Sequence, residues 1–167
     1  MHIATRRAVQ GDAGTIARIY NEGIVDGHAT FETEPRGPED IRAALAEGFP
    51  AVVATVEGDV VGWAWAPPYR PHRSAYSGVA EFSVYVARSA RGRGVGRAAL
   101  GALIQDAEAR GYWKLLSRVF PENEASLALC RSLGFREVGT YRRHALLDGE
   151  WKDCVIVEVL LGPAAGP

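Results

Sequence analysis

Alternating apolar and polar positions, together with runs of β-branched side chains, predict strands at intervals from the N-terminus to the C-terminus. Glu57-Gly58-Asp59 separates two of these runs and is a strong hairpin signal, and Asp148-Gly149-Glu150 joins another pair in the same way. Trp63 and Trp65 alternate with alanines, so both indoles should lie on one face of their strand. The predicted strands cover residues 3–8, 51–56, 60–66, 82–86, 114–120, 136–147 and 151–161.

Apolar residues at helical spacing predict helices between these strands. Asp12 suits an N-cap, Pro38 suits a first helical turn, and Gly111 suits a helix end. Residues 26–36 and 69–76 have no clear period and are expected to be loops. The expected helices run from Asp12 to residues 21–23, from Pro38 to Gly48, from about Gly94 to Arg110, and from residues 121–124 to Gly134. The pattern predicts a mixed α/β (α+β) domain with one sheet and helices on both faces.

The length of 167 residues suits one domain, which we assign to residues 1–162 with a frayed tail at 163–167. A net charge of -1 argues against a general binder of nucleic acid or anionic membranes. The N-terminus has no apolar signal core, and no apolar run is long enough to span a membrane. Cys130 and Cys154 have no spacing typical of disulfide scaffolds or metal sites. We therefore expect a cytoplasmic protein that needs no metal and binds neither nucleic acid nor membrane.

The strand at 82–86 leads through a polar spacer into a glycine-rich turn at residues 91–96, which opens the third helix. Such a turn exposes consecutive backbone N–H groups, and the helix N-terminus adds partial positive charge. Arg91, Arg93 and Arg97 add full positive charges at the same place. The sequence therefore predicts a pocket for a phosphate-bearing cofactor.

Residues 94–99 satisfy the G-x-G-x-x-A pattern of dinucleotide-binding folds, but residues 87–90 separate this turn from its strand, and a hairpin precedes it. A Walker loop fails because no Gly-Lys-Ser/Thr follows. Residues 91–96 instead meet every fixed position of the pattern Q/R-x-x-G-x-G/A, and Asn123 with Leu133-Gly134-Phe135 forms a second characteristic segment. On these segments the sequence resembles the GCN5-related N-acetyltransferase (GNAT) superfamily. The resemblance implies the GNAT fold, with a single, mostly antiparallel sheet, a splayed strand pair at the cofactor site, and acetyl-CoA as co-substrate.

Further passages resemble the phosphinothricin N-acetyltransferase group, and some are most similar to its arsinothricin-resistance branch. This resemblance implies transfer of acetyl from acetyl-CoA to the α-amine of a small acidic amino-acid analogue, which gives toxin resistance. Phosphinothricin, arsinothricin and methionine sulfoximine are the implied substrate types, and a homodimer is the implied assembly. The passages are residues 19–21, 30–35, 69–73, 80–86, 120–124, 138–144 and 148–153.

The resemblance also implies that the glycine turn wraps the pyrophosphate while the preceding strand holds the thioester. Backbone N–H groups around Tyr85 and Val86 are then expected to stabilise the developing oxyanion. Asn123 is expected to touch the cofactor, although it equally suits a helix N-cap. The expected cofactor-binding residues are Val84, Tyr85, Val86, Arg91, Gly92, Arg93, Gly94, Val95, Gly96, Arg97, Asn123 and Ser126.

An α-amine is protonated near neutral pH and cannot attack a thioester until a base removes a proton. Glu81, just ahead of the cofactor strand, is the predicted base, and a solvated strand-edge carboxylate is the alternative. Guanidinium groups suit carboxylate, phosphinate and arsinate, so Arg70 and Arg73 are the predicted clamps, although an ordinary exposed loop carries the same residue types. The expected substrate-binding residues are Phe31, Arg70, Arg73, Tyr76, Glu81 and Ser83.

Cys130 stands where many superfamily members have Tyr, and the phosphinothricin branch often has His, as general acid for the departing thiolate. A thiol on an apolar helix face protonates a thiolate only weakly, so we expect solvent protonation or unassisted departure. Two alternative functions remain: acetylation of peptide, protein or other amines, and a non-catalytic acyl-CoA sensor.

Overall fold

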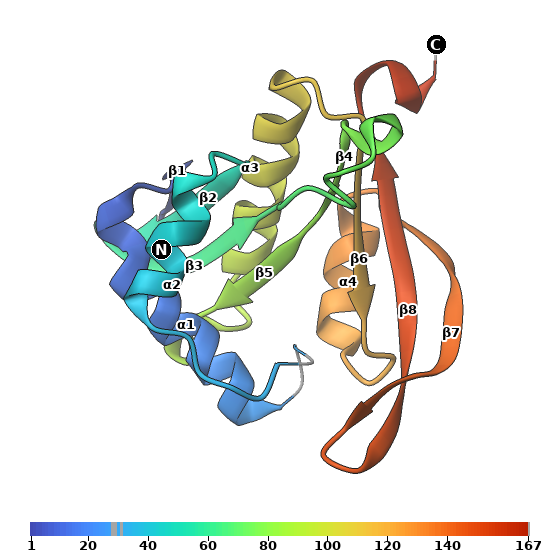
Figure 1. Cartoon of the computed structure of the whole chain (residues 1–167). Helices are drawn as coiled ribbons and strands as arrows, with labels where there is room; N and C mark the ends of the chain where they lie inside the picture. The colour runs from blue at the N-terminus through green and yellow to red at the C-terminus, as the bar shows by residue number, and fades with distance from the viewer. Residues whose placement is uncertain (28–29, 31, 167) are drawn as a thin grey trace.

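The computed structural model describes residues 1–27, 30 and 32–166, and Figure 1 shows the arrangement of its helices and strands. The strands are β1 (Ile3–Arg7), β2 (Ala51–Val56), β3 (Asp59–Trp65), β4 (Val79–Glu81), β5 (Ser83–Val86), β6 (Lys114–Val119), β7 (Arg136–Leu147) and β8 (Glu150–Leu160). The α-helices are α1 (Ala13–Asp26), α2 (Pro38–Ala46), α3 (Val95–Ala109) and α4 (Glu124–Ser132).

Within the described residues, the strands form two four-stranded sheets with the orders β1-β2-β3-β5 and β4-β6-β8-β7. Neighbouring strands are antiparallel except β4 and β6, which are parallel. Figure 1 shows β5 and β6 diverging from the place where β4 gives way to β5. The mixed α/β class and the splayed strand pair predicted from the sequence are confirmed.

The splay divides the hydrogen-bonded ladder into two sheets where one was expected. Phe82, the single residue between β4 and β5, donates its N–H to the carbonyl of Leu116 at 2.9 Å, as the end of the β4–β6 ladder. From Ser83 onward the chain pairs with β3 instead, with Ser83 opposite Trp65. The strand thus changes partner at one residue, and the strands beyond that residue separate.

The core lies between the first sheet and the helices that cover its two faces. Helix α1 packs against β3 and β5, and α3 packs across β1, β2, β3 and β5. Trp63 and Trp65 are 1% and 6% exposed, and their ring centroids lie 4.8 Å apart. Both indoles therefore share the buried face that their alternation predicts.

Helix α1 extends to Asp26, beyond the predicted end at residues 21–23. Gly23 lies inside the helix, and the Tyr85 ring packs closely against it because glycine has no side chain. A Cβ on Gly23 would lie only 3.0 Å from this ring. Gly27, with φ of 72°, ends the helix in the left-handed conformation that glycine adopts without strain. A glycine inside the helix was thus mistaken for its end.

Asp12 precedes α1 as predicted, but its carboxylate makes no cap bond to the helix. It accepts hydrogen bonds from both terminal guanidinium nitrogens of Arg6 at 2.9 Å and from the Val9 N–H at 2.8 Å. The hydrogen bonds from Arg6, opposed by burial, lower the pKa of Asp12 below its ordinary value. Asp12 therefore ties β1 to the start of α1.

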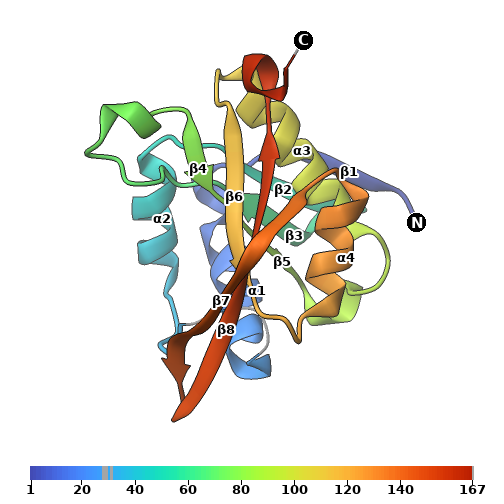
Figure 2. The same ribbon diagram turned by 90° about the vertical axis from the view of Figure 1, so that its right-hand side faces the viewer.

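The C-terminal strands β7 and β8 form a long hairpin that projects beyond the rest of the molecule, as Figure 2 shows. Large apolar side chains on it are exposed, among them Tyr141, Leu146 and Trp151. Gly162–Ala165 forms a short 3₁₀ helix after β8. In the described part of the chain, no helix has the length and apolar character needed to cross a membrane.

Candidate active site

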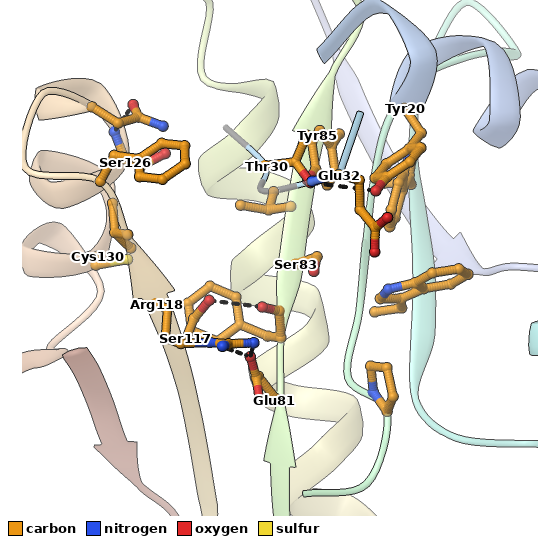
Figure 3. A pocket seen from close by; sticks show the side chains of 18 of the residues that line it. Tyr20, Thr30, Glu32, Glu81, Ser83, Tyr85, Ser117, Arg118, Ser126 and Cys130 are labelled. Carbon is orange, nitrogen blue, oxygen red and sulfur yellow. Dashed lines mark hydrogen bonds and ion pairs between the residues drawn. The ribbon is translucent and has the colours of Figure 1, made fainter. Parts of the chain in front are cut away.

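The divergence of β5 from β6 opens a cavity of about 350 Å³, shown in Figure 3. Glu81 lies between its walls, at the end of β4. The wall formed by β6 and α4 contributes Ser117, Arg118, Asn123, Ser126 and Cys130. The opposite wall, formed by β5, α1 and the chain after α1, contributes Ser83, Val84, Tyr85, Tyr20, Thr30, Glu32 and Arg36.

An ion pair between Glu81 and Arg118 crosses the place where the strands separate (Figure 3). Arg118 Nε and Nη2 lie 3.1 and 2.8 Å from Glu81 Oε2. Both nitrogens contact this one oxygen, and within the described residues Oε1 accepts no hydrogen bond. Glu81 is half-buried and lines the cavity, so a carboxylate oxygen is available to a group bound there.

Ser117 secures the branch point from the side of β6. Its Oγ donates to the carbonyl of Phe82 at 2.9 Å. The Phe82 N–H makes the last backbone bond of the β4–β6 ladder, so within the described residues the Phe82 carbonyl has no backbone donor on β6. The Ser117 hydroxyl supplies this carbonyl with a hydrogen bond instead. Ser117 thus fixes the geometry next to Glu81.

Helix α1 positions the opposite wall of the cavity. Tyr20 Oη lies 3.3 Å from Thr30 Oγ1, which also accepts the Glu32 N–H at 3.0 Å. Asn21 exchanges two hydrogen bonds of 2.9 Å with the backbone of Arg36. The Arg36 guanidinium lies 5.1 Å from the centroid of the Tyr20 ring and 3.5 Å from Glu32. Both signs of charge therefore line this wall.

The deep part of the cavity is aromatic. Tyr85 is buried, and its ring centroid lies 5.0 Å from those of Tyr20 and Trp63. Burial is the largest cause of a raised pKa for both tyrosines, strongly so for Tyr85. Both phenols are neutral at physiological pH, so they serve as walls and hydrogen-bonding groups rather than as bases.

Helix α4 and its N-cap residue place Asn123, Ser126 and Cys130 on the cavity, of which the first two were predicted site residues. Asn123 Oδ1 accepts the Ser126 N–H at 3.1 Å, so Asn123 is the N-cap of α4. Cys130 is 3% exposed, and burial raises the pKa of its thiol to about 11. Ser132 donates to the Leu129 carbonyl and is not among the cavity-lining residues. Among the described residues, no group of His, Cys, Asp and Glu side chains is arranged to hold a metal ion.

The glycine turn has the backbone that phosphate binding requires. Gly92 and Gly94 have φ of 75° and 85°, and Gly94 is the N-cap of α3. The first intrahelical bond is donated by Ala98 to the Gly94 carbonyl, so the N–H groups of residues 95–97 lack helical acceptors. Arg93 and Arg97 are exposed beside them. The turn therefore presents backbone donors and two positive charges together.

Arg91 differs from the other two arginines because it is engaged within the protein. Its Nη1 lies 2.6 Å from Asp26 Oδ2, and its Nε donates to the Val86 carbonyl at 3.2 Å. Asp26 also pairs with Arg88 at 2.8 Å, and these hydrogen bonds lower the pKa of Asp26. The end of α1 thereby holds the spacer and the glycine turn against β5.

The β3–β5 pairing decides which backbone groups of β5 face the gap. Ala87 donates its N–H to Val61 on β3, and polar groups of successive strand residues point to alternate sides. Tyr85 therefore turns its backbone N–H toward β3, while Val84 and Val86 turn theirs toward the gap. The bond from Arg91 to the Val86 carbonyl agrees with this direction. Of the two expected oxyanion donors, Val86 has the required direction and Tyr85 does not.

The predicted clamp residues lie outside the cavity lining. Arg70, Arg73 and Tyr76 are on the loop between β3 and β4, with exposed side chains, and Arg70 lies over the Tyr69 ring at 5.3 Å. Phe31, the remaining predicted substrate contact, lies outside the described residues. The structure thus brings Glu81 and Ser83 together with four of the predicted cofactor-binding residues, Val84, Tyr85, Asn123 and Ser126. Val86, the glycine turn at residues 91–97 and the loop arginines do not line this cavity.

Several cavity-lining residues were absent from the sequence-based prediction of the site. They are Tyr20, Thr30, Glu32, Arg36, Ser117 and Arg118. The first three fall in two of the passages that carry the family resemblance, which was a usable signal, and Arg36 directly follows the second of these passages. Arg118 had no such signal, because a single arginine in a β-strand is usually a solvated side chain.

Comparison with known proteins gives consistent results. Residues 17–135 match the sequence model of the Acetyltransferase (GNAT) family. A phosphinothricin N-acetyltransferase of Alcaligenes faecalis is 37% identical over 152 residues, which cover 88% of this chain and 77% of that protein. An L-methionine sulfoximine/L-methionine sulfone acetyltransferase of Pseudomonas aeruginosa is 34% identical over 161 residues, which cover 93% of this chain and 87% of that protein. The crystal structure of a phosphinothricin acetyltransferase from Sinorhizobium meliloti in complex with AcCoA superposes with a TM-score of 0.91 at 32% identity. The superposition covers 98% of this chain and 91% of the chain in that structure.

Proposed function

Because this chain belongs to the acetyltransferase (GNAT) family, we propose that it transfers acetyl from acetyl-CoA to the α-amine of a small acidic amino-acid analogue. Phosphinothricin, arsinothricin and methionine sulfoximine are the substrate types, and their acetylation confers resistance to them. The carrying observation is Glu81, which faces a small cavity where the strands part, just ahead of the glycine turn. The names of the relatives, and the large share of each chain over which they align with this one, support the substrate class.

Glu81 acts as the general base of this reaction. Its carboxylate takes a proton from the α-ammonium group, directly or through one water, and the freed amine attacks the thioester carbon. The backbone N–H groups of Val84 and Val86, directed into the gap, hydrogen-bond to the oxyanion that develops. The carbon–sulfur bond then breaks, so that the products are the N-acetylated amino acid and CoA.

Cys130 is a poor general acid for the departing thiolate. Its pKa of about 11 makes it a weaker acid than an ordinary thiol, so proton transfer to CoA from Cys130 is uphill. Solvent therefore protonates the CoA thiolate. Cys130 contributes to the wall of the cavity as a small apolar side chain.

The glycine turn binds the pyrophosphate of acetyl-CoA. The N–H groups of residues 95–97 donate to phosphate oxygens, and Gly92 and Gly94 allow the close approach. Arg93 and Arg97 add charge, and Arg91 holds the turn to β5. Asn123 and Ser126 line the path of the pantetheine arm from their positions on the cavity.

Arg70, Arg73 and Tyr76 receive the side-chain anion of the acceptor at the mouth of the cavity. Their loop starts from Pro67 and Pro68, which line the cavity, and the Pro67 carbonyl accepts the Glu81 N–H at 3.0 Å. Phe31 and Ser83 complete the acceptor-binding residues in this proposal.

The proposed assembly is a homodimer in the cytoplasm. The β7–β8 hairpin exposes Tyr141, Leu146 and Trp151, and contact with a second copy of the chain would remove these apolar side chains from water. Analytical ultracentrifugation tests the assembly: a monomer at micromolar concentration would contradict it.

A thiol-release assay with a panel of acceptors tests the function. The panel contains phosphinothricin, arsinothricin, methionine sulfoximine and a short peptide with a free N-terminal amine. We expect turnover with the amino-acid analogues and little with the peptide. Preference for the peptide would favour a peptide acetyltransferase, and no turnover despite acetyl-CoA binding would favour an acyl-CoA sensor.

A further inference from the structure

The Arg118–Glu81 pair places a positive and a negative group next to each other on the cavity surface. Arg118 Nη2 lies 2.8 Å from Glu81 Oε2, and both residues line the cavity. The side chains are 45% and 32% exposed, so the pair is open to a bound molecule. Exposed ion pairs of this kind add little to the free energy of unfolding, so stabilising the fold does not account for this pair and a role in binding is considered.

Arg118 has donors left over after it binds Glu81. A guanidinium group carries five N–H donors, and the two bonds to Glu81 come from Nε and Nη2 alone. Within the described residues, Nη1 makes no hydrogen bond. Arg36, the other described arginine that lines the cavity, belongs to the opposite wall and is engaged with Glu32. Arg118 is therefore the cation nearest the proposed base that still has donors to offer.

A free α-amino acid presents the complementary arrangement. Its ammonium and carboxylate groups are attached to the same carbon, so they lie side by side with opposite charge. An ammonium group that reaches Glu81 for deprotonation therefore brings its carboxylate close to the neighbouring guanidinium. Charge-assisted hydrogen bonds between guanidinium and carboxylate are among the stronger and more directional ones in proteins.

We propose that Arg118 binds the α-carboxylate of the acceptor, so that the Glu81–Arg118 pair recognises the head group shared by all free α-amino acids. This inference rests on the proposed acetylation of a small amino acid, and it names the residue that selects for it. A peptide N-terminus has an amide carbonyl where the free amino acid has this carboxylate. Arg118 thereby discriminates against peptide amines, whereas the side-chain anion is bound elsewhere.

The test compares methionine sulfone with its α-carboxamide in the wild-type protein and in Arg118→Gln. The two acceptors share the amine and the side chain and differ only at the group that Arg118 is proposed to bind. The amines of the two acceptors differ in basicity. This difference cancels when the acid-to-amide ratio of kcat/KM in the wild-type protein is divided by the same ratio in the variant. We expect Arg118→Gln to lower kcat/KM about 10- to 100-fold for the acid, mainly through KM, and less than about threefold for the amide.

Arg136→Gln is the matched control. Arg136 on β7 binds Glu158 on β8 in the same way, with Nε and Nη2 at 3.2 and 2.7 Å from a single carboxylate oxygen. It does not line the cavity, so both acceptors should keep their wild-type kinetics. Arg118→Lys retains the charge without the planar fork and should restore part of the preference for the acid.

Equal losses for acid and amide in Arg118→Gln would overturn the inference, because Arg118 would then act only by positioning Glu81. Unchanged kinetics for both acceptors would also overturn it. If the wild-type protein acetylates a peptide and neither methionine sulfone derivative, the proposed function itself fails. The two failures are therefore distinguished by the wild-type measurement alone.

Discussion

Gly62 on β3 packs directly beneath the first residue of α3, and its replacement by alanine tests how the cofactor turn is positioned. A Cβ at residue 62 would lie 2.6 Å from Val95 Cγ1 and 3.3 Å from the Tyr85 carbonyl oxygen. Carbon atoms in contact are normally about 3.5–4.0 Å apart, so Val95 would have to retreat by about 1 Å. Val95 is 1% exposed and β-branched, so it cannot relieve the overlap by rotating its side chain.

The expected cost of Gly62→Ala follows from this overlap. Overpacking of a core usually costs about 1–3 kcal/mol, and we expect the free energy of unfolding to fall by that amount in urea. Because α3 starts at Val95, the retreat also displaces the backbone donors of residues 95–97. We expect the KM for acetyl-CoA to rise about 3- to 10-fold, which corresponds to about 0.7–1.4 kcal/mol, with little change in the acceptor KM.

A second-site variant and a control make this reasoning refutable. Val95→Ala removes the methyl group that Gly62→Ala would meet. The loss of unfolding free energy in the double variant should therefore be about 1 kcal/mol smaller than the sum of the losses in the two single variants. Gly101→Ala lies within α3, and its Cβ would be 4.0 Å from Leu133, so it should stabilise by about 0.5–1 kcal/mol. Additive effects in the double variant, or an unchanged KM for acetyl-CoA in Gly62→Ala, would refute the account.

Three further predictions concern charges and the buried thiol. Asp26→Asn releases Arg88 and Arg91, which hold the glycine turn against β5, so initial rates should give a KM for acetyl-CoA that is higher by up to about fivefold. Asp106→Asn removes another aspartate that is held by two arginines, and it should leave this KM unchanged. Asp12 has a lowered pKa, so its stabilisation is complete above its unfolded-state pKa and is lost as pH falls. Urea unfolding should therefore show a gap between wild type and Asp12→Asn that narrows below about pH 4, and a constant gap would contradict it. Cys130, with a pKa of about 11, should be alkylated about 10²-fold more slowly at pH 8 in the folded protein than after unfolding, as measured by peptide mass mapping.

The elements of the fold were predictable because their signals are local. Strand alternation, the hairpin turns and the glycine turn each depend on neighbouring residues, and all were found near their predicted places. The end of α1 was wrong because Gly23 looks like a helix end unless one knows that the Tyr85 ring packs against it. The change of partner at Phe82 was also hidden, since pairing between distant strands leaves no local pattern.

The same limit explains the predictions about the site. Glu81 could be proposed from the sequence because it precedes a recognisable strand, but its partner Arg118 is far along the chain and is joined to it only by the fold. Arg70 and Arg73 form a conspicuous local cluster, yet a sequence gives no direction for a loop, and neither side chain lines the cavity. The fold thus places a cation next to the proposed base, and the sequence could not reveal this neighbour.

The rate of acetyl transfer by Glu81→Gln is the most direct test of the central claim, that this carboxylate drives α-amine acetylation where the strands part. Thiol release at saturating acetyl-CoA and neutral pH should show kcat at least about 10²-fold below that of the wild-type protein. Acetyl-CoA should bind to both proteins with similar affinity, because residue 81 does not belong to the glycine turn. A kcat within about threefold of the wild-type value would contradict the account.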